Sequence, residues 1–129
     1  MDLDFKKLDG LVPAIIQDAG TGEVLMLGFM NADAYSATQK SGEVTFFSRS
    51  RNKLWRKGEQ SGHVLKVRDI RVDCDVDALL VRVEALGPGV CHEGYRSCFF
   101  REISASGELK LVAERTFDPN AVYGKESQK

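Results

Sequence analysis

The sequence predicts an α+β fold, a mostly antiparallel β-sheet with one clear helix, in a single domain of residues 1–129. Three observations predict it. Short apolar stretches recur along the chain between clusters of Gly, Asn, Asp and Ser, which is typical of antiparallel strands joined by turns. Only residues 31–42 have clear helical spacing. The length of 129 residues matches one ordinary domain and leaves no room for a second core.

The N-terminal part of the chain predicts a hairpin followed by the helix. Residues 11–18 and 24–30 are apolar, and the turn-forming residues 18–22 lie between them. Asn31 is a preferred helix N-cap, and Gly42 is a preferred residue at a helix end. The helix is therefore expected between these two residues.

The rest of the chain predicts strands and a polar tail. The further strands are expected at residues 44–48, 53–57, 64–73, 78–86, 98–103 and 109–113. In the strand 78–86, every second residue is apolar, which predicts one buried face. The last two strands are expected to pair around the turn Ser106-Gly107. Residues 118–129 form a polar tail whose last residues are expected to be mobile.

Composition and charge exclude several classes of protein. Apolar residues make up 43% of the chain and charged residues 29%, so it is neither disordered nor a membrane protein. The 18 basic and 19 acidic residues give a net charge of −1, which argues against nucleic acid as a partner. No basic segment leads into an apolar stretch near Met1, so we expect no secretory signal and a cytoplasmic protein.

The cysteines predict a metal site. There are three of them, Cys74, Cys91 and Cys98. An odd number favours reduced thiols, and no pair has the spacing of a zinc ribbon or a dithiol redox motif. Three thiols suit an open zinc site, with His92 or His63 as a possible further ligand. The alternative is that the cysteines are small buried hydrophobic residues, and Cys74 continues the apolar face of Ile70 and Val72.

Three aspartates, Asp73, Asp75 and Asp77, alternate with Cys74 and Val76. In an extended chain their carboxylates would project to one side and Cys74 to the other. Carboxylate oxygen is a ligand that Mg²⁺ favours, and a cation would relieve the repulsion between them. The alternative is a solvated acidic edge.

A basic segment between residues 49 and 57 predicts phosphate binding. Its candidate binding residues are Ser48, Arg49, Ser50, Arg51, Trp55, Lys57, Glu59 and Ser61. Arginine side chains and exposed backbone amides recognise phosphate well, and Trp55 could stack on a base. The alternative is an edge strand whose charges prevent aggregation.

Taken together, these segments resemble the phosphoribosyl-AMP cyclohydrolase family over roughly residues 9–117. The matching stretches are residues 11–18 (Leu-Val-Pro-Ala-Ile-Ile-Gln-Asp), 21–31, 47–62, 73–80 (Asp-Cys-Asp-Val-Asp-Ala-Leu-Leu) and 91–99 (Cys-His-Glu-Gly-Tyr-Arg-Ser-Cys-Phe). Two positions depart from the pattern: Glu93 replaces a small hydroxyl residue, and His63 replaces a frequent Asn. Neither departure removes a candidate metal ligand.

The resemblance implies a homodimer whose active sites lie between subunits. One zinc ion per subunit would be held by Cys74 of one chain together with Cys91 and Cys98 of the other. The aspartates Asp73, Asp75 and Asp77 would bind Mg²⁺. The chain is too short for the fused second enzyme domain that some relatives carry, so we expect the cyclohydrolase domain alone.

The reaction implied is the third step of L-histidine biosynthesis. Water opens the adenine ring of 1-(5-phosphoribosyl)-AMP at the N1–C6 bond, and the product is the formimino-aminoimidazole carboxamide ribotide. Zinc would lower the pKa of a bound water to roughly 7 and so supply hydroxide. His92 is the first candidate for the general acid or base, and His63 is the second. The basic segment and Mg²⁺ would hold the two phosphates of the nucleotide.

Two rival functions remain open from the sequence. One is a non-catalytic zinc-stabilised binding module that contacts its partner through residues 49–57, which requires a fourth protein ligand on zinc. The other is a structural domain with three inert thiols and no metal.

Overall fold

The computed structural model describes residues 2–123 and confirms the predicted fold class. Its elements are β1 (Val12–Asp18), β2 (Val24–Met30), α1 (Ala32–Ser41), β3 (Thr45–Ser48), β4 (Lys53–Arg56), β5 (Leu65–Val72), β6 (Leu79–Ala85), β7 (Arg101–Ile103), β8 (Leu109–Leu111) and α2 (Pro119–Tyr123). No helix within these residues is long and apolar enough to cross a membrane.

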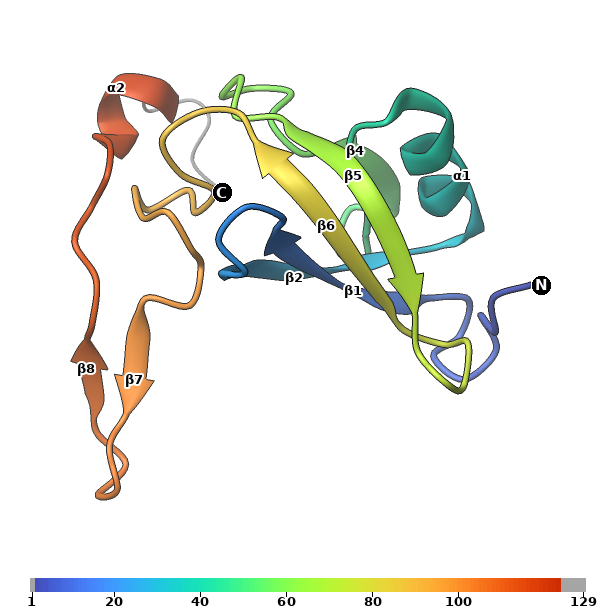
Figure 1. Cartoon of the computed structure of the whole chain (residues 1–129), viewed down its shortest axis with the longest axis horizontal. Coiled ribbons are helices and arrows are strands. Elements are labelled where there is room, and N and C mark those ends of the chain that lie inside the picture. The colour runs from blue at the N-terminus through green and yellow to red at the C-terminus, as the bar shows by residue number, and fades with distance from the viewer. Residues whose placement is uncertain (1, 124–129) are drawn as a thin grey trace.

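The main sheet has four strands in the order β2-β1-β6-β5, and two separate hairpins, β3-β4 and β7-β8, flank it (Figure 1). Neighbouring strands are antiparallel except for β1 and β6, which run parallel, with Ile15 beside Leu80. Helix α1 lies at one side of the molecule and the β7-β8 hairpin extends from the other (Figure 1).

The two residues predicted to mark the ends of the helix, Asn31 and Gly42, do so in the structure. The side chain of Asn31 accepts a hydrogen bond from the Ala34 N–H at 2.8 Å, which satisfies a free donor in the first turn. Gly42 follows the last residue with φ of 74°, a conformation that costs glycine little, and its N–H donates to the Thr38 carbonyl. The helix and the turn around Gly42 lead directly into β3.

The core lies on one face of the main sheet. Alternate residues of β1 and β6 are almost fully buried on this face: Val12, Ala14, Ile16, Leu79, Val81 and Val83. Phe46 of β3 packs against β2 so closely that a Cβ added to Gly28 would lie 2.5 Å from its ring. This contact joins the β3-β4 hairpin to the sheet and positions the segment that follows it.

Two predictions need correction, and a third lies partly outside the described residues. Strand β5 ends at Val72, and residues 73–78 form a tight loop rather than an extended strand. The loop contains Val76 with φ of +55°, which a strand does not allow. The last hairpin is confirmed but is shorter than predicted, at three residues per strand. The polar tail contains the short helix α2, and the predicted mobility of its last residues lies outside the described residues.

Candidate functional site

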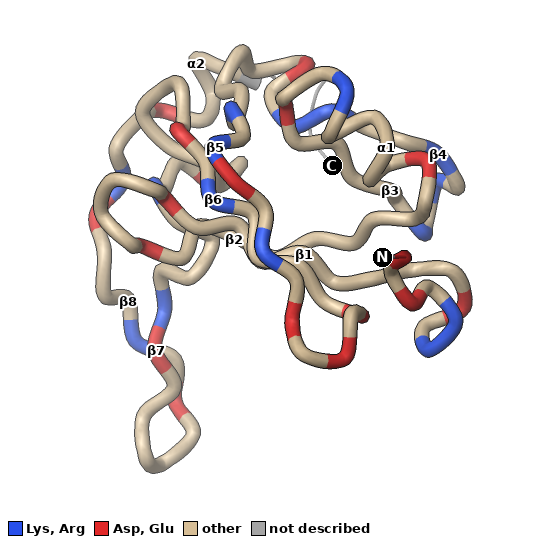
Figure 2. Tube along the Cα trace, turned by 45° about the vertical axis from the view of Figure 1, so that its right-hand side comes forward, with Lys and Arg blue, Asp and Glu red and all other residues tan. Residues whose placement is uncertain are grey.

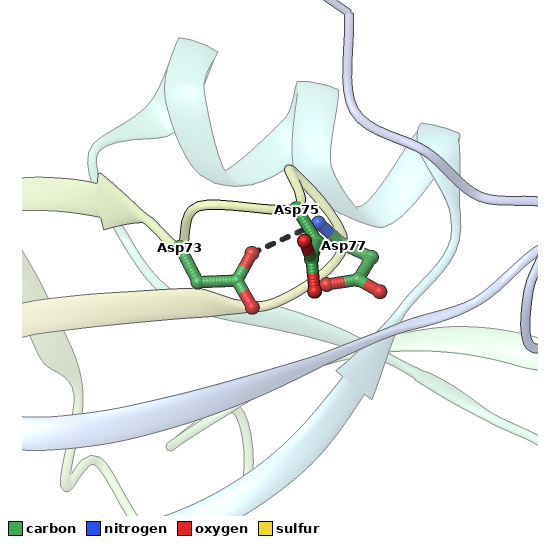
Figure 3. Close-up of side chains that lie close together, drawn as sticks. All are labelled: Asp73, Asp75 and Asp77. Atoms are coloured by element: carbon green, nitrogen blue, oxygen red, sulfur yellow. Dashed lines mark hydrogen bonds between the residues drawn. The ribbon is translucent and has the colours of Figure 1, made fainter.

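The three aspartates converge although the strand that was expected to align them is absent. Oxygen atoms of Asp73, Asp75 and Asp77 all lie within 4.8 Å of one another in the 73–78 loop (Figure 3). The loop is held closed because Asp73 Oδ1 accepts hydrogen bonds from the N–H groups of Asp77 (3.1 Å) and Ala78 (3.2 Å). Three carboxylate groups at this spacing, two of them exposed and that of Asp77 half-buried, fit a hard divalent cation.

Cys74 lies in the same loop. It was expected either in the core or on the side opposite to the carboxylates, and it is in neither position. It is exposed, so it is not a core residue continuing the apolar face of β5. Its Sγ lies 3.8 Å from Asp75 Oδ1, so the loop does not place the thiol and this carboxylate on opposite sides. The prediction that Cys74 and Asp75 point to opposite sides is therefore wrong. Residues 73–78 form a turn, and in a turn neighbouring side chains do not alternate as they do in a strand.

Cys91 and Cys98 form a thiol pair at the other end of β6. The Cys98 thiol donates a hydrogen bond to the Cys91 sulfur, and this is the main reason why the pKa of Cys91 is lowered to about 6 although burial opposes the shift. The Glu93 N–H also donates to the Cys91 sulfur, at 3.4 Å. The same thiol hydrogen bond is the main reason why the pKa of Cys98 is raised. A soft cation bound to the two sulfur atoms would displace their protons.

The peptide backbone fixes this pair against the main sheet. The Cys98 N–H donates to the Leu25 carbonyl at 2.7 Å, and the Ser97 hydroxyl donates to the Val24 carbonyl at 2.8 Å. A tight turn closes the segment, because the Cys91 N–H donates to the Tyr95 carbonyl at 3.0 Å. The two thiols therefore occupy a defined position beside the first residues of β2.

The three cysteines do not meet within one chain. Cys74 precedes β6 and Cys91 follows it, and a seven-residue strand is about 20 Å long. Among the described residues, the only group of three potential metal ligands within bonding reach of one ion is the aspartate cluster. A three-thiolate set therefore requires thiols from two chains.

Lys57 was predicted to bind phosphate, but it lies close enough to the thiol pair for its charge to act on them. The residue is 8% exposed, and its Nζ lies 5.8 Å from the centre of the Trp55 ring. Burial lowers the pKa of Lys57, while the negative charges of Cys98 and Cys91 act in the opposite direction. A buried ammonium group here would offset the negative charge of a thiolate site.

The two histidines have different surroundings. His63 Nδ1 lies 3.0 Å from the Gly89 carbonyl, and because a carbonyl only accepts, Nδ1 is the donor; in the neutral ring this leaves the lone pair on Nε2. The His63 ring also packs edge-to-face on Phe117, with centroids 4.9 Å apart. His63 thus supports the turn that leads to Cys91. His92 is exposed and adjoins Cys91 in the chain.

A hollow of about 610 Å³ lies where β2 meets the β3-β4 hairpin. Its lining combines apolar and aromatic residues with Arg49 and Ser50, and it includes Trp55 and Phe29. The Arg49 guanidinium stacks on the Phe29 ring at 4.4 Å from the centroid. Phe29 was not predicted as a binding residue, because an aromatic residue within an apolar strand predicts only burial. The volume and lining suit a small organic ligand that carries an anionic group.

The other predicted phosphate-binding residues do not line this hollow. Ser48 ends β3 and Arg51 lies in the turn that follows, where Ser48 Oγ accepts from the Arg51 N–H at 3.3 Å. Glu59 and Ser61 stabilise the next turn: Glu59 accepts from the Arg56 N–H, and Ser61 accepts from the His63 N–H. Figure 2 shows the basic residues in and around β4. The structure therefore groups Arg49, Ser50 and Trp55.

Asp18 joins the thiol segment to the turn between β1 and β2. Its Oδ1 accepts from the N–H groups of Gly20 (2.7 Å) and Thr21 (3.0 Å), and Oδ2 pairs with Arg96. Burial acts to raise the pKa of Asp18, but these hydrogen bonds and the Arg96 charge outweigh it and lower the pKa below its usual value. Arg96 also donates to Glu23 at 2.7 Å.

We expect Asp18→Asn to destabilise the protein by about 1 kcal/mol at pH 7, a value reduced by the partial exposure of Arg96. Because the folded-state pKa is depressed, this stabilisation is present above the carboxyl's ordinary pKa and disappears as pH falls through the folded-state value. Urea unfolding should show the difference at pH 7 and none near pH 2. Glu23→Gln, in a more exposed pair, is the control with a smaller effect. An equal difference at both pH values would contradict the assignment.

Comparison with known proteins identifies the family of the chain. The family model described as phosphoribosyl-AMP cyclohydrolase matches residues 26–100. A phosphoribosyl-AMP cyclohydrolase from Solibacter usitatus is 61% identical over 127 residues, covering 98% of this chain and 100% of the relative. Proteins of the same name from Nitratidesulfovibrio vulgaris (55%; 93% and 94% covered) and Desulforapulum autotrophicum (52%; 95% and 98% covered) are also similar. The three relatives match nearly the whole chain, and the chain belongs to the phosphoribosyl-AMP cyclohydrolase family of hydrolases.

Proposed function

We propose that the chain catalyses the hydrolytic opening of the N1–C6 bond of 1-(5-phosphoribosyl)-AMP, in the third step of L-histidine biosynthesis. The observation that carries the proposal is the match of nearly the entire chain, at 61% identity, to a protein named for this activity. The thiol pair, the aspartate cluster and the arginine-lined hollow support it. The free thiols fit a reducing, cytoplasmic compartment.

We propose that the active enzyme is a homodimer with one zinc site per subunit. Cys91 and Cys98 supply two adjacent thiols, and the exposed Cys74 of the second copy would supply the third. Three thiolates fit zinc, which when bound would supply a hydroxide at neutral pH. Lys57 lies near enough to offset part of the negative charge. The donor set supports this assignment, because one chain alone offers only the pair.

The chain's own residues would then bind the nucleotide and move protons. We propose His92 as the general acid or base that brings a proton to N1, because it is exposed beside Cys91. His63 is the second candidate for the general acid or base, because Nε2 of its neutral ring has a lone pair that can accept a proton. Its contact with Gly89 also holds the turn before Cys91 in place.

The hollow beside β2 would take one phosphate end of the nucleotide, with Arg49 as its main contact. We expect Arg49→Ala to raise KM at least about tenfold with little change in zinc content, because a charged hydrogen bond to phosphate contributes about 1.5–3 kcal/mol. Arg51→Ala is the matched control from the same turn and should have a smaller effect, since Arg51 does not line the hollow. Equal effects of the two variants on steady-state KM would contradict this role of the hollow.

The aspartate cluster would bind Mg²⁺, in competition with a lysine of the same chain. Lys7 Nζ lies 2.8 Å from Asp77 Oδ2, and this hydrogen bond is the main reason why the pKa of Asp77 is lowered. We expect Lys7→Met to tighten Mg²⁺ binding roughly two- to fivefold, the range that an exposed ion pair allows. Calorimetric titration would measure it. Lys6→Met is the control and should leave the affinity unchanged; weaker binding in Lys7→Met would contradict the competition.

The test of the function is direct. Purified, zinc-loaded protein is incubated with 1-(5-phosphoribosyl)-AMP and Mg²⁺, and the ring-opened product is separated by chromatography. We expect many turnovers per site, and loss of activity when a chelator removes the metals. A folded, zinc-loaded protein that forms no product would instead favour the binding module that contacts a partner through residues 49–57.

A further inference from the structure

The β7-β8 hairpin has two faces of different chemistry. Cross-strand pairing places Ile103 beside Leu109 and Arg101 beside Leu111, while Glu102 pairs with Lys110 on the opposite face. Side chains alternate across a hairpin, so Ile103, Leu109 and Leu111 form one apolar face. Such a face is typical of a strand pair that packs on another surface.

This apolar face is nevertheless exposed within the chain. Ile103 is 71% exposed, Leu109 62% and Leu111 56%. The hairpin extends away from the main sheet in both views (Figures 1 and 2), and every residue from 101 to 116 except Ser104 is exposed. An isolated two-stranded hairpin is marginally stable, and a cluster of exposed large apolar residues marks an interaction surface.

A second unpacked apolar surface lies on the main sheet. The register places Leu27 of β2, Ile15 of β1 and Leu80 of β6 in one row across three strands, on the face opposite the core. Leu27 is 44% exposed and Ile15 is 37% exposed. The sheet therefore has an apolar row that remains accessible on its outer face.

We propose that the apolar face of the β7-β8 hairpin packs on the outer sheet face, at Ile15, Leu27 and Leu80, of a second copy of this chain. This inference rests on the homodimer of the proposed function and names the surface that forms it. We assign a second copy as the partner because each chain carries both apolar surfaces. In a two-fold dimer the hairpin of each chain can then pack on the sheet of the other, which gives two equivalent contacts.

The position of the cysteines supports the same occupant. The thiol pair lies just before β7, at the base of the hairpin, whereas Cys74 follows β5 at the far end of the sheet. A hairpin that reaches across the sheet of its neighbour is a means of bringing the pair of one chain toward Cys74 of the other. The hairpin would thus join the two halves of the site.

Leu109→Asp and Ile15→Lys test the contact by size-exclusion chromatography with light scattering. We expect the wild-type chain to have twice the monomer mass. Each variant should raise the dimer dissociation constant at least about a hundredfold, because both symmetric contacts are lost together. Neither side chain is in the core, so each monomer should stay folded. The control Ser106→Asp places the same charge at the exposed hairpin turn and should remain dimeric.

Mixing the two variants makes the test specific. In a dimer of one Leu109→Asp chain and one Ile15→Lys chain, one contact is wild-type and the other joins opposite charges. We therefore expect the mixture to recover dimers that neither variant forms alone. Variants that stay dimeric like the control would overturn the hairpin contact while leaving the homodimer intact. A monomeric wild-type chain that still opens the ring would overturn the dimer itself.

Discussion

Two inactive variants, Cys74→Ser and Cys98→Ser, should regain about a quarter of wild-type activity when their subunits are mixed and exchanged. If each site takes Cys74 from one chain and the thiol pair from the other, one of the two sites in a mixed dimer has all three cysteines. Random exchange makes about half of the dimers mixed. Half the dimers with half their sites complete gives the expected quarter.

The control for this experiment is a mixture of Cys91→Ser with Cys98→Ser. Both changes fall in the same half of the site, so no mixed dimer contains a complete set of thiols. This mixture should stay inactive at the same degree of subunit exchange, which mass spectrometry of isotope-labelled chains can follow. Activity that fails to return in the first mixture, despite exchange, would mean that each site lies within one chain.

Cys98→Ser alone should abolish both zinc retention and catalysis. A bound metal contributes several kcal/mol of transition-state stabilisation, and about 4 kcal/mol corresponds to a thousandfold in rate. We therefore expect kcat/KM to fall at least about a thousandfold. Elemental analysis should find less than about a tenth of the wild-type zinc, since losing a ligand costs more than the 10–100-fold of a lost outer-shell contact.

The fold should survive this change, because Cys98 is exposed and serine has a similar volume. Its N–H bond to the Leu25 carbonyl does not depend on the side chain. Thermal unfolding of the metal-free variant beside metal-free wild type would check this. Ser106→Ala, at an exposed turn, serves as the control for zinc and rate. A Cys98→Ser variant with a full complement of zinc would exclude this thiol as a ligand.

The local signals in the sequence predicted the local structure. Asn31 and Gly42 marked the two ends of α1 because capping depends on one residue and its own backbone neighbours. The alternating residues of β6 correctly predicted its buried face. The parallel pairing of β1 with β6 left no such signal, because a period of two is the same in parallel and antiparallel strands.

The sequence predicted which residue types make up the candidate site, but it predicted less well how they are arranged in space. The repeat Asp-x-Asp-x-Asp continued the period of β5, yet Val76 adopts a left-handed conformation that β-branched residues rarely take, and no glycine announces the turn. The proximity of Lys57 to the thiols, and of Lys7 to Asp77, depends on contacts between distant segments. Residue types alone do not predict such contacts.

The parallel pairing of β1 and β6 also bears on when the protein can fold during its synthesis. Strand β1 ends at Asp18, but its central partner ends at Ala85. The β1-β2 hairpin can form early, while the sheet cannot close until β6 has left the ribosome. At about 5–20 residues per second, the 67 residues that separate the ends of β1 and β6 take roughly 3–13 seconds to synthesise. Throughout that interval the inner face of the nascent hairpin stays open to solvent and to chaperones, and Cys91 and Cys98 follow only after β6 is complete.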